Sequence, residues 1–452
     1  MLETPSDWLP VLAKQMDAEA RELKRKRDYC NGNAPLPEMG SNLRASWKQF
    51  QKKSRIDYGG LAVQALKNRI RPNGVRIGDG SDNPAALAAQ RIWRDNRLDA
   101  QFSTAILDRL ETSVGYLVTG KGSAGSVITA ERPEDFLAIP EPSAPWKTRA
   151  ALKVLRDPVL GRDFAWVWAG GFRQRFVRES RQHGIELVSK YSDTWMLDGE
   201  PEIYGGAAPI VALRRPSGRA LLEQHFDAID AINHGKLQRL VVTAMQAFRQ
   251  RGIKLPAGST FGESDDDGNE PDYTKMFEPA PGALWELPEG IDVWESEQTD
   301  IRPLLEGEKA DRRDFAAVTS TPLSVFMPEG QNQSAEGAAN AKEGHVSLAQ
   351  DEIDDIRPNI AMALVHALGI QGVDLADLTV EVDFAPPALV SLSERHEAAS
   401  KAKATGVLSR RTIQRDILGM TPEQIRQDEA DFAAEQLGNM LIAEQVVNAT
   451  NA

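Results

Sequence analysis

Apolar residues recur at three- and four-residue spacing in several long stretches of the chain, which is the pattern of helices that bury one face. The first stretch covers 5–28, where Leu9, Leu12 and Met16 share a face and the basic run 21–27 suits a helix C-terminus. Residues 41–115 are also mostly helical by pattern, with breaks at 71–74 and 78–84. The N-terminal quarter is therefore predicted to be largely helical.

The hydrophobic period changes between 115 and 213. Short runs rich in Val, Ile, Leu, Phe and Trp alternate there with turn residues, as in 116–119, 126–129 and 164–169. Strands that follow one another without intervening helices pair in an antiparallel way. We therefore expect an α+β fold rather than repeated βαβ units.

Helical spacing returns in the second half of the chain. A stripe over 216–252 predicts a helix about 45–50 Å long. A second helix is expected over 301–318, and a third from an N-cap at Ser334 to 368, with a kink at Pro358. After a strand at 378–387, three further helices are predicted at 389–404, at 410–418 and after the capping box that starts at Thr421.

Between the first two of these helices, residues 255–300 have a composition of their own. Asp and Glu number 13 there, against one basic residue, Lys275, and Pro and Gly are scattered throughout. We expect a small acidic module with an exposed tip near 261–272 and two short strands within 282–296. The carboxylates near the tip lack the spacing of a calcium-binding EF-hand loop, so a solvated loop is favoured over a metal site.

Composition narrows the class of protein. The chain has 452 residues, 41% hydrophobic and 26% charged, with a formal charge of −13 and a single cysteine, Cys30. These values indicate a folded protein with two or three domains and no disulfide framework. No apolar run reaches about 18 residues and the N-terminus lacks a signal-peptide core, so we expect assembly inside a cell and no membrane partner. The acidic balance disfavours a sequence-reading DNA-binding factor.

Catalytic motifs are not found in the sequence. Gly115–Gly122 resembles a phosphate-binding loop, but Gly122 stands where that motif needs Ser or Thr, and the surrounding residues predict a β-hairpin. The six histidines show no metal-binding spacing, and no G-x-S-x-G motif is present. We therefore expect a structural protein that is not an enzyme and needs no metal or cofactor.

The segment 321–344 combines a polar loop with a crowded helix start. Its small residues are expected to let neighbouring helices approach closely, because glycine costs a helix about 1 kcal/mol relative to alanine and needs a compensating role. These predicted packing residues are Ala335, Gly337, Ala338, Ala339, Ala341 and Gly344.

The order of these parts over some 400 residues resembles the portal proteins of tailed double-stranded DNA bacteriophages, of the siphovirus type. The resemblance implies an α+β portal fold with an α/β wing, long stem helices, a small α/β clip, a tunnel loop and a helical C-terminal crown. Its parts would be the wing (1–220), a stem helix (221–252), the clip (253–299), a second stem helix (300–319), the tunnel loop (320–333), the long kinked helix with a returning wing strand (334–385) and the crown region (386–452). The C-terminal region is short, so a large crown is not expected.

The resemblance also implies a function and partners. Portal proteins form a twelve-subunit ring at one capsid vertex of the virion, assembled in the host cytoplasm, through which DNA is packaged and ejected without sequence preference. The ring would contact the terminase large subunit at the clip, the major capsid and scaffold proteins, and head-completion (adaptor) proteins. The residues expected to face DNA in the tunnel loop are Met327, Pro328, Glu329, Gly330, Gln331, Asn332 and Gln333. The alternatives are another oligomeric scaffold of the phage head or connector, and a nucleic-acid enzyme.

Overall fold

The structure, a computed structural model, divides into two units that are described separately. The first unit comprises Met1–Ala34, Asp57–Phe226 and Ala316–Ala452, and the second comprises Pro35–Ile56 and Asp227–Phe315. The residues that the structure describes are 3–38, 45–78, 83–123, 125–180, 188–190, 194–205, 207–247, 251–254, 292–295, 299–327, 335–375, 378–388 and 392–450.

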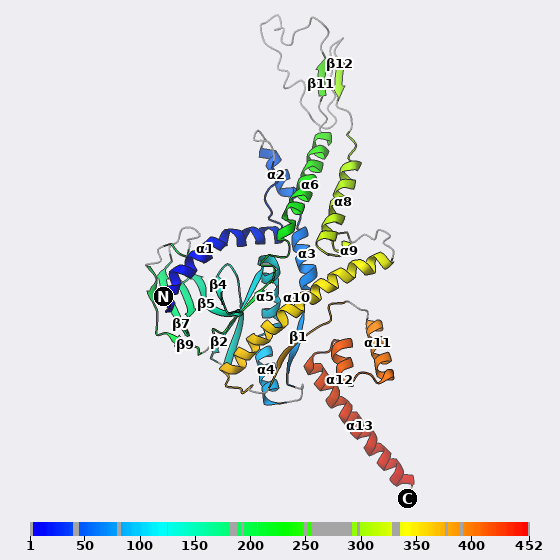
Figure 1. Cartoon of the computed structure of the whole chain (residues 1–452). Coiled ribbons are helices and arrows are strands. Elements are labelled where there is room, and N and C mark those ends of the chain that lie inside the picture. The colour runs from blue at the N-terminus through cyan, green and yellow to red at the C-terminus, as the bar shows by residue number, and fades with distance from the viewer. Residues whose placement is uncertain are drawn as a thin grey trace, which may run out of the picture. The chain divides into compact units, whose positions relative to one another are not determined.

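The chain has a mixed α+β fold, as its pattern predicts (Figure 1). The helices of the first unit are α1 (Pro5–Cys30), α3 (Tyr58–Lys67), α4 (Pro84–Asp95), α5 (Leu98–Thr112), α9 (Leu323–Phe326), α10 (Ala335–Ile370), α11 (Leu392–Thr405), α12 (Arg410–Thr412) and α13 (Pro422–Thr450). Its strands are β1 (Pro72–Ile77), β2 (Val114–Gly122), β3 (Gly125–Glu131), β4 (Phe136–Glu141), β5 (Ala144–Asp157), β6 (Arg162–Ala169), β7 (Phe172–Glu179), β8 (Met196–Leu197), β9 (Glu202–Ile203), β10 (Ile210–Arg214) and β13 (Val380–Phe384). The second unit holds α2 (Ala45–Ser54), most of α6 (Phe226–Ala247) and of α8 (Arg302–Val318), β11 (Arg251–Lys254) and β12 (Asp292–Glu295).

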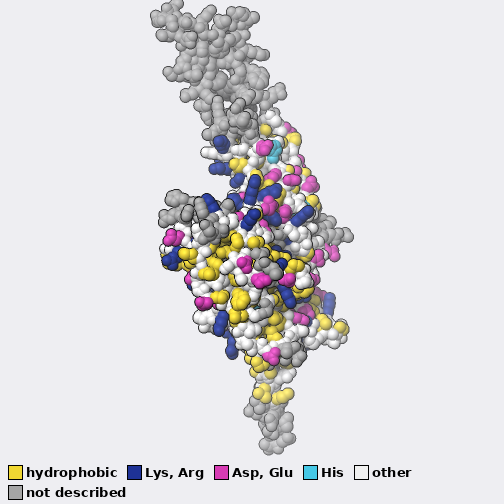
Figure 2. All heavy atoms as spheres, turned by 60° about the vertical axis from the view of Figure 1, so that its left-hand side comes forward, with side chains coloured by type: hydrophobic (Ala, Val, Ile, Leu, Met, Phe, Trp, Pro, Cys, Tyr) yellow, Lys and Arg dark blue, Asp and Glu magenta, His cyan; other side chains and the backbone are white. Residues whose placement is uncertain are grey.

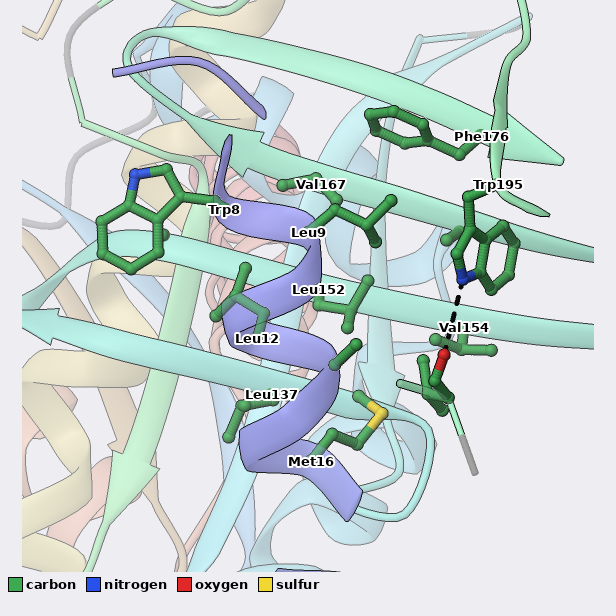
Figure 3. Packing of buried hydrophobic residues seen from close by; sticks show 14 of the residues in the cluster. Trp8, Leu9, Leu12, Met16, Leu137, Leu152, Val154, Val167, Phe176 and Trp195 are labelled. Carbon is green, nitrogen blue, oxygen red and sulfur yellow. Dashed lines mark hydrogen bonds between the residues drawn. The ribbon is translucent and has the colours of Figure 1, made fainter. Parts of the chain in front are cut away.

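Helix α1 begins with a capping box and packs on the largest sheet. The Thr4 hydroxyl accepts a hydrogen bond from the Asp7 backbone N–H, and the Asp7 carboxylate accepts one from the Thr4 backbone N–H. Figure 3 shows the apolar face of α1 lying against the strands, with Leu12 fully buried between them. Burial of this face fixes the helix on the sheet, because each buried Leu or Met side chain contributes about 1.5–3 kcal/mol.

Two antiparallel sheets form the centre of the first unit. The larger runs β4-β5-β6-β7-β8, with β9 also paired to β7, and the smaller runs β10-β2-β3. A second apolar cluster lies between them, built around Tyr116, Phe136 and Trp168. Position 115 in β2 accepts only glycine, because a Cβ there would lie 1.9 Å from the carbonyl oxygen of Ala105 in α5. The predicted antiparallel pairing over 115–213 is confirmed.

A third sheet pairs two strands that are far apart in the sequence. Strand β1 lies within the region predicted to be mostly helical, and it pairs with β13 in antiparallel register, Val75 opposite Val382. The break predicted at 71–74 is thus the start of a strand. The error has a physical reason, since β1 is stabilised by a partner about 300 residues away that no local pattern reveals.

The helix predicted over 216–252 is shorter than expected. Residues before Phe226 form a turn and the 3₁₀ segment η2 (Glu223–His225), and 251–254 form β11. Leu222 is fully buried, and the Glu223 carboxylate accepts hydrogen bonds from the Ala220 N–H and pairs with Lys26. Tertiary contacts therefore hold this stretch in a turn although its apolar spacing favours a helix. Similarly, the helix predicted over 410–418 is α12 continued by the π-helical turn η3 (Ile413–Ile417).

The other predicted helices are confirmed with small changes at their ends. Helix α8 begins at Arg302, α10 runs from Ala335 to Ile370 with Pro358 inside it, and α11 ends just before Gly406. The capping box at the start of α13 is present, because Thr421 and Gln424 exchange hydrogen bonds between side chain and backbone N–H. Of the two strands predicted within 282–296, β12 is confirmed and the remainder lies outside the described residues.

In the second unit, α6 and α8 lie side by side. The Arg239 guanidinium of α6 donates to the Glu308 carboxylate of α8 over 2.9 Å, and Arg312 pairs with the same carboxylate. Gln246 near the end of α6 donates to the backbone carbonyl of Thr299, which precedes α8. Strands β11 and β12 pair in antiparallel register, so the chain leaves along α6 and returns along α8.

A buried ion cluster holds α10 in the first unit. Arg109 of α5 is 1% exposed and donates to Glu352 and Asp355 of α10, at 2.9 and 2.5 Å, and to the backbone carbonyl of Arg214 in β10. Arg215 pairs with the other oxygen of Glu352. These contacts join three elements that are distant in sequence.

We expect Arg109→Leu to lower the free energy of unfolding by about 3 kcal/mol, because the buried Glu352 would keep only Arg215 as a partner and the Arg214 carbonyl would lose its donor. Urea denaturation followed by circular dichroism measures this change. The matched control is Arg94→Leu on α4, where the arginine is 75% exposed and pairs with its neighbour Asp95; there we expect a change within about 0.5 kcal/mol. Equal losses for the two variants would contradict the assigned role of Arg109.

Candidate functional site

The structure describes the residues that lead into the predicted tunnel loop, up to Met327, and those that lead out of it, from Ala335 on. We call these two segments the incoming arm and the outgoing arm. Met327, the first of the residues expected to face DNA, is half-buried, and its backbone N–H donates to the Leu323 carbonyl. Pro328 to Gln333 lie outside the described residues, so their position toward DNA stays a prediction. The backbone of Ala335, Gly337, Ala338, Ala339 and Ala341 is helical in α10, but their side chains are not described.

Gly344 is the one predicted packing residue whose surroundings are described. It is exposed, and a Cβ there would have open space around it. Within this single chain Gly344 therefore makes no close helix contact in the described part of the structure. Its predicted packing role would need another subunit.

The incoming arm turns sharply at the end of α8. Ser320 has φ +50°, a left-handed conformation that side chains rarely adopt, and the Thr321 N–H bonds to the Ala316 carbonyl across the turn. Helix α9 follows, and its Phe326 is buried with the ring edge-on to Tyr58 of α3, the ring centroids 5.4 Å apart. The chain therefore enters the loop from a fixed point.

The outgoing arm is tied to the incoming one by His345 of α10. This side chain is 2% exposed, and its Nδ1 lies 3.0 Å from the backbone carbonyl oxygen of Ser320. A carbonyl oxygen only accepts, so Nδ1 carries the proton and donates it. One hydrogen bond thus joins the two ends of the loop, and it uses the carbonyl of the strained turn.

The environment of His345 keeps its ring neutral at pH 7. Burial lowers its pKa below the ordinary value of 6.5, and the nearby charge of Arg69 acts in the same direction. The carbonyls of Ala65 and Ser320 oppose this shift without cancelling it. The joint between the arms is therefore sensitive to acid.

The Arg109 cluster fixes α10 further along. Glu352 lies two helical turns after His345, so the ion cluster and the histidine hold successive parts of one rigid helix. The sequence gives little warning of either contact. The only available signal is Arg109 itself, a charged residue on the otherwise apolar face of 98–112.

The motif that resembles a phosphate-binding loop lies in a hairpin of the first unit. Strands β2 and β3 pair in antiparallel register, with Gly122 opposite Gly125, which confirms the hairpin prediction for Gly115–Gly122. Among the described residues, no group of His, Cys, Asp and Glu is arranged to hold a metal ion. In that same part of the chain, no helix is long and apolar enough to cross a membrane.

Comparison with known proteins gives a loose structural likeness. No protein-family model and no curated protein matches the chain. Among solved structures, a chain of the virion of a native gene transfer agent particle aligns at 16% identity over 88% of this chain and 99% of its own, with a TM-score of 0.47. A chain from the neck of that native particle, computed with C12 symmetry, aligns at 14% identity over 88% of this chain and 99% of its own, with a TM-score of 0.47. An HK97-family phage portal protein from Corynebacterium diphtheriae aligns at 14% identity over 73% of this chain and 95% of its own, with a TM-score of 0.33.

Because an unfolded chain binds a proton at a free histidine below pH 6.5 that folded His345 does not accept, stability should fall as the pH drops through about 6.5. The variant His345→Asn keeps a donor for the Ser320 carbonyl but has no histidine to protonate. On acidification from about pH 7.5 to 5.5, we expect its free energy of unfolding to fall by about 1 kcal/mol less than that of wild type.

Urea denaturation at the two pH values measures the difference. His396→Asn, at an exposed position of α11, serves as the control and should keep the pH dependence of wild type. If His345→Asn and wild type lose the same free energy on acidification, the histidine is not the acid-sensitive joint.

Proposed function

We propose that the chain is the subunit of a phage portal, a ring at one capsid vertex that forms the channel for DNA packaging and ejection. The observation that carries the proposal is the excursion of the chain through α6, the β11–β12 ladder and α8. It stands in the same sequence position as the stem–clip–stem excursion of the family that the sequence resembles. The predicted tunnel loop, 320–333, and the long helix α10 follow in the order expected from the resemblance.

The two helices of the excursion suit a stem that is covered by neighbours. By their length α6 and α8 span about 33 and 26 Å. Most described apolar positions in the last three turns of α6 are only half-buried, and Leu305 of α8 is 37% exposed. A pair of helices buries one face of each, so the remaining half-buried positions would be covered by further helices in a ring.

The C-terminal helices also carry faces that the chain itself does not cover. None of the residues of α11 is buried, and Leu392 at its start is 71% exposed. On α13, Leu437 and Met440 are 61% and 67% exposed. Exposed apolar side chains on isolated helices are typical of a subunit that assembles, since helical stability in water comes mainly from packing.

The charge distribution suits a channel that lets DNA slide. On the face drawn in Figure 2, the Lys and Arg side chains are interspersed with Asp and Glu, and hydrophobic patches lie between them. With a net charge of −13, the subunit would neutralise few phosphates. Each neutralised phosphate adds affinity that movement must break, so sparse basic contacts favour passage over binding. Met327 to Gln333 would form a weakly charged collar around the duplex.

The proposal includes a set of partners. The ring would have twelve subunits, the terminase large subunit would dock at the module 253–299, and the major capsid, scaffold and head-completion proteins would contact the remainder. The virion vertex would be its place after assembly in the host cytoplasm. A structural role requires no enzymatic site, cofactor or metal.

Electron microscopy of the purified protein tests the assembly directly. We expect twelve-fold rings with an axial hole, because a portal subunit leaves its stem and C-terminal helices to be covered by neighbours. Monomers, or closed particles of another symmetry, would favour the alternative of a different head or connector scaffold. Hydrolysis of ATP or of DNA by the purified protein would instead favour an enzyme.

Shortening the loop tests the channel role. Deletion of Glu329 to Asn332 should leave the ring intact but strongly reduce DNA packaged or retained in particles, because the collar would no longer reach the duplex. Quantitative PCR of nuclease-protected DNA measures retention. The control deletes Pro158 and Val159 from the β5–β6 turn, where Val159 is 91% exposed; two residues then remain between the paired Asp157 and Arg162, and packaging should be unchanged. Loss of the ring in the loop variant would mark the loop as structural.

A further inference from the structure

A cavity of about 260 Å³ lies between the β2–β3 hairpin and the face of the large sheet that is turned away from α1. Its apolar lining includes Val118, Val127, Trp166 and Trp168. We call it the tryptophan pocket. It belongs to the first unit alone, and neither the loop nor the stem contributes to it.

The apolar walls are preformed. Trp168 is 3% exposed and belongs to the cluster between the two sheets, where its ring lies 6.0 Å from that of Phe136. Trp166, two residues away on the same face of β6, is half-buried beside Phe164, with ring centroids 6.1 Å apart. Val127 opposite is 40% exposed. A ligand side chain would therefore enter a rigid slot with little ordering cost.

The polar groups at the rim are mostly donors. Lys121, Lys153 and Arg173 all line the pocket, against a single carboxylate, Glu131. Glu131 already accepts from Lys153 over 2.6 Å and from the Thr129 hydroxyl.

Two of the three rim cations already have a carboxylate partner, and the third does not. Arg173 pairs with Glu202 over 2.6 Å, and Lys153 pairs with Glu131. Lys121 is exposed and forms no ion pair with any residue that the structure describes. Over the same described residues, the indole N–H of Trp166 donates to no acceptor. The rim thus offers one ammonium group and one indole donor to an incoming acceptor.

We propose that the tryptophan pocket binds an acidic peptide segment of a partner protein, with one branched or aromatic side chain in the slot between Val127 and Trp166 and an adjacent carboxylate on Lys121. Charge complementarity and the donor excess select an anion, and the apolar slot selects a side chain next to it. A peptide fits better than a nucleic-acid strand. One cation without a carboxylate partner matches one carboxylate rather than a phosphate chain.

Photo-crosslinking tests the site in any state of assembly. The probe is acetyl-Glu-photoleucine-Glu-amide, whose diazirine side chain is small enough for the slot, and attachment sites are mapped by mass spectrometry. We expect crosslinks to the peptides that contain Val118, Val127 and Trp166. Acetyl-Lys-photoleucine-Lys-amide should label these peptides about tenfold less, because its charges repel Lys121.

Charge reversal of the rim separates recognition from folding. Lys121→Glu should lower labelling by the acidic probe about tenfold and raise labelling by the basic probe, a gain that a misfolded variant cannot show. Lys147→Glu, an exposed lysine of β5 outside the pocket, is the control and should label like wild type.

Three outcomes would overturn the assignment: equal labelling by the two probes, crosslinks mapped to other surfaces, or displacement of the acidic probe by oligothymidylate more readily than by unlabelled acetyl-Glu-Leu-Glu-amide. The last would indicate a nucleic-acid site. The proposal does not depend on the ring, so a portal ring without labelling would refute the pocket alone.

Discussion

One buried arginine determines how the first unit is put together. The Arg109 guanidinium lies between α5, α10 and β10, where it meets two carboxylates and a backbone carbonyl. A charge this deeply buried is tolerated only when its partners are in place, so the cluster admits one register of α10 along α5. Since α10 carries His345 on its exit from the loop, the same register brings that ring to the Ser320 carbonyl.

Helix α5 acts as the common support because its buried charged residues point in different directions. While Arg109 faces α10, Asp108 and Glu111 face Arg27 of α1, which also reaches Glu134. Burial raises the pKa of Asp108 and Glu111, and Arg27 only partly offsets the effect. Three carboxylates around one guanidinium keep α1 on the sheet and α5 in the centre, so the arms of the loop rest on a framework held by charge as well as by apolar packing.

The sequence pattern predicted correctly those elements that depend on contacts between residues close together in the chain. The apolar spacing and caps identified α1, α8 and α10, and the alternation with glycine turns identified the β2–β3 hairpin. The predictions were wrong where contacts with residues distant in the sequence determine the local structure. Strand β1 exists because of β13, and the stretch before Phe226 is a turn because Leu222 and Glu223 have buried partners. The anchors of the loop depend on such contacts too, which is why the sequence indicated the loop but neither His345 nor Arg109 as its supports.

Helices α5 and α10 bury charged groups, whereas the C-terminal helices expose apolar ones, and this difference affects assembly. The buried charged groups of α5 and α10 pair with one another within the chain. The C-terminal helices α11 and α13 keep their charges at the surface and leave Leu437 and Met440 exposed. A buried charge cluster gives a subunit one shape before it meets another, whereas exposed apolar helices gain stability only from a neighbour. Under the proposed ring, each subunit would therefore bring a preformed loop support to the channel, and assembly would stabilise the periphery without altering it.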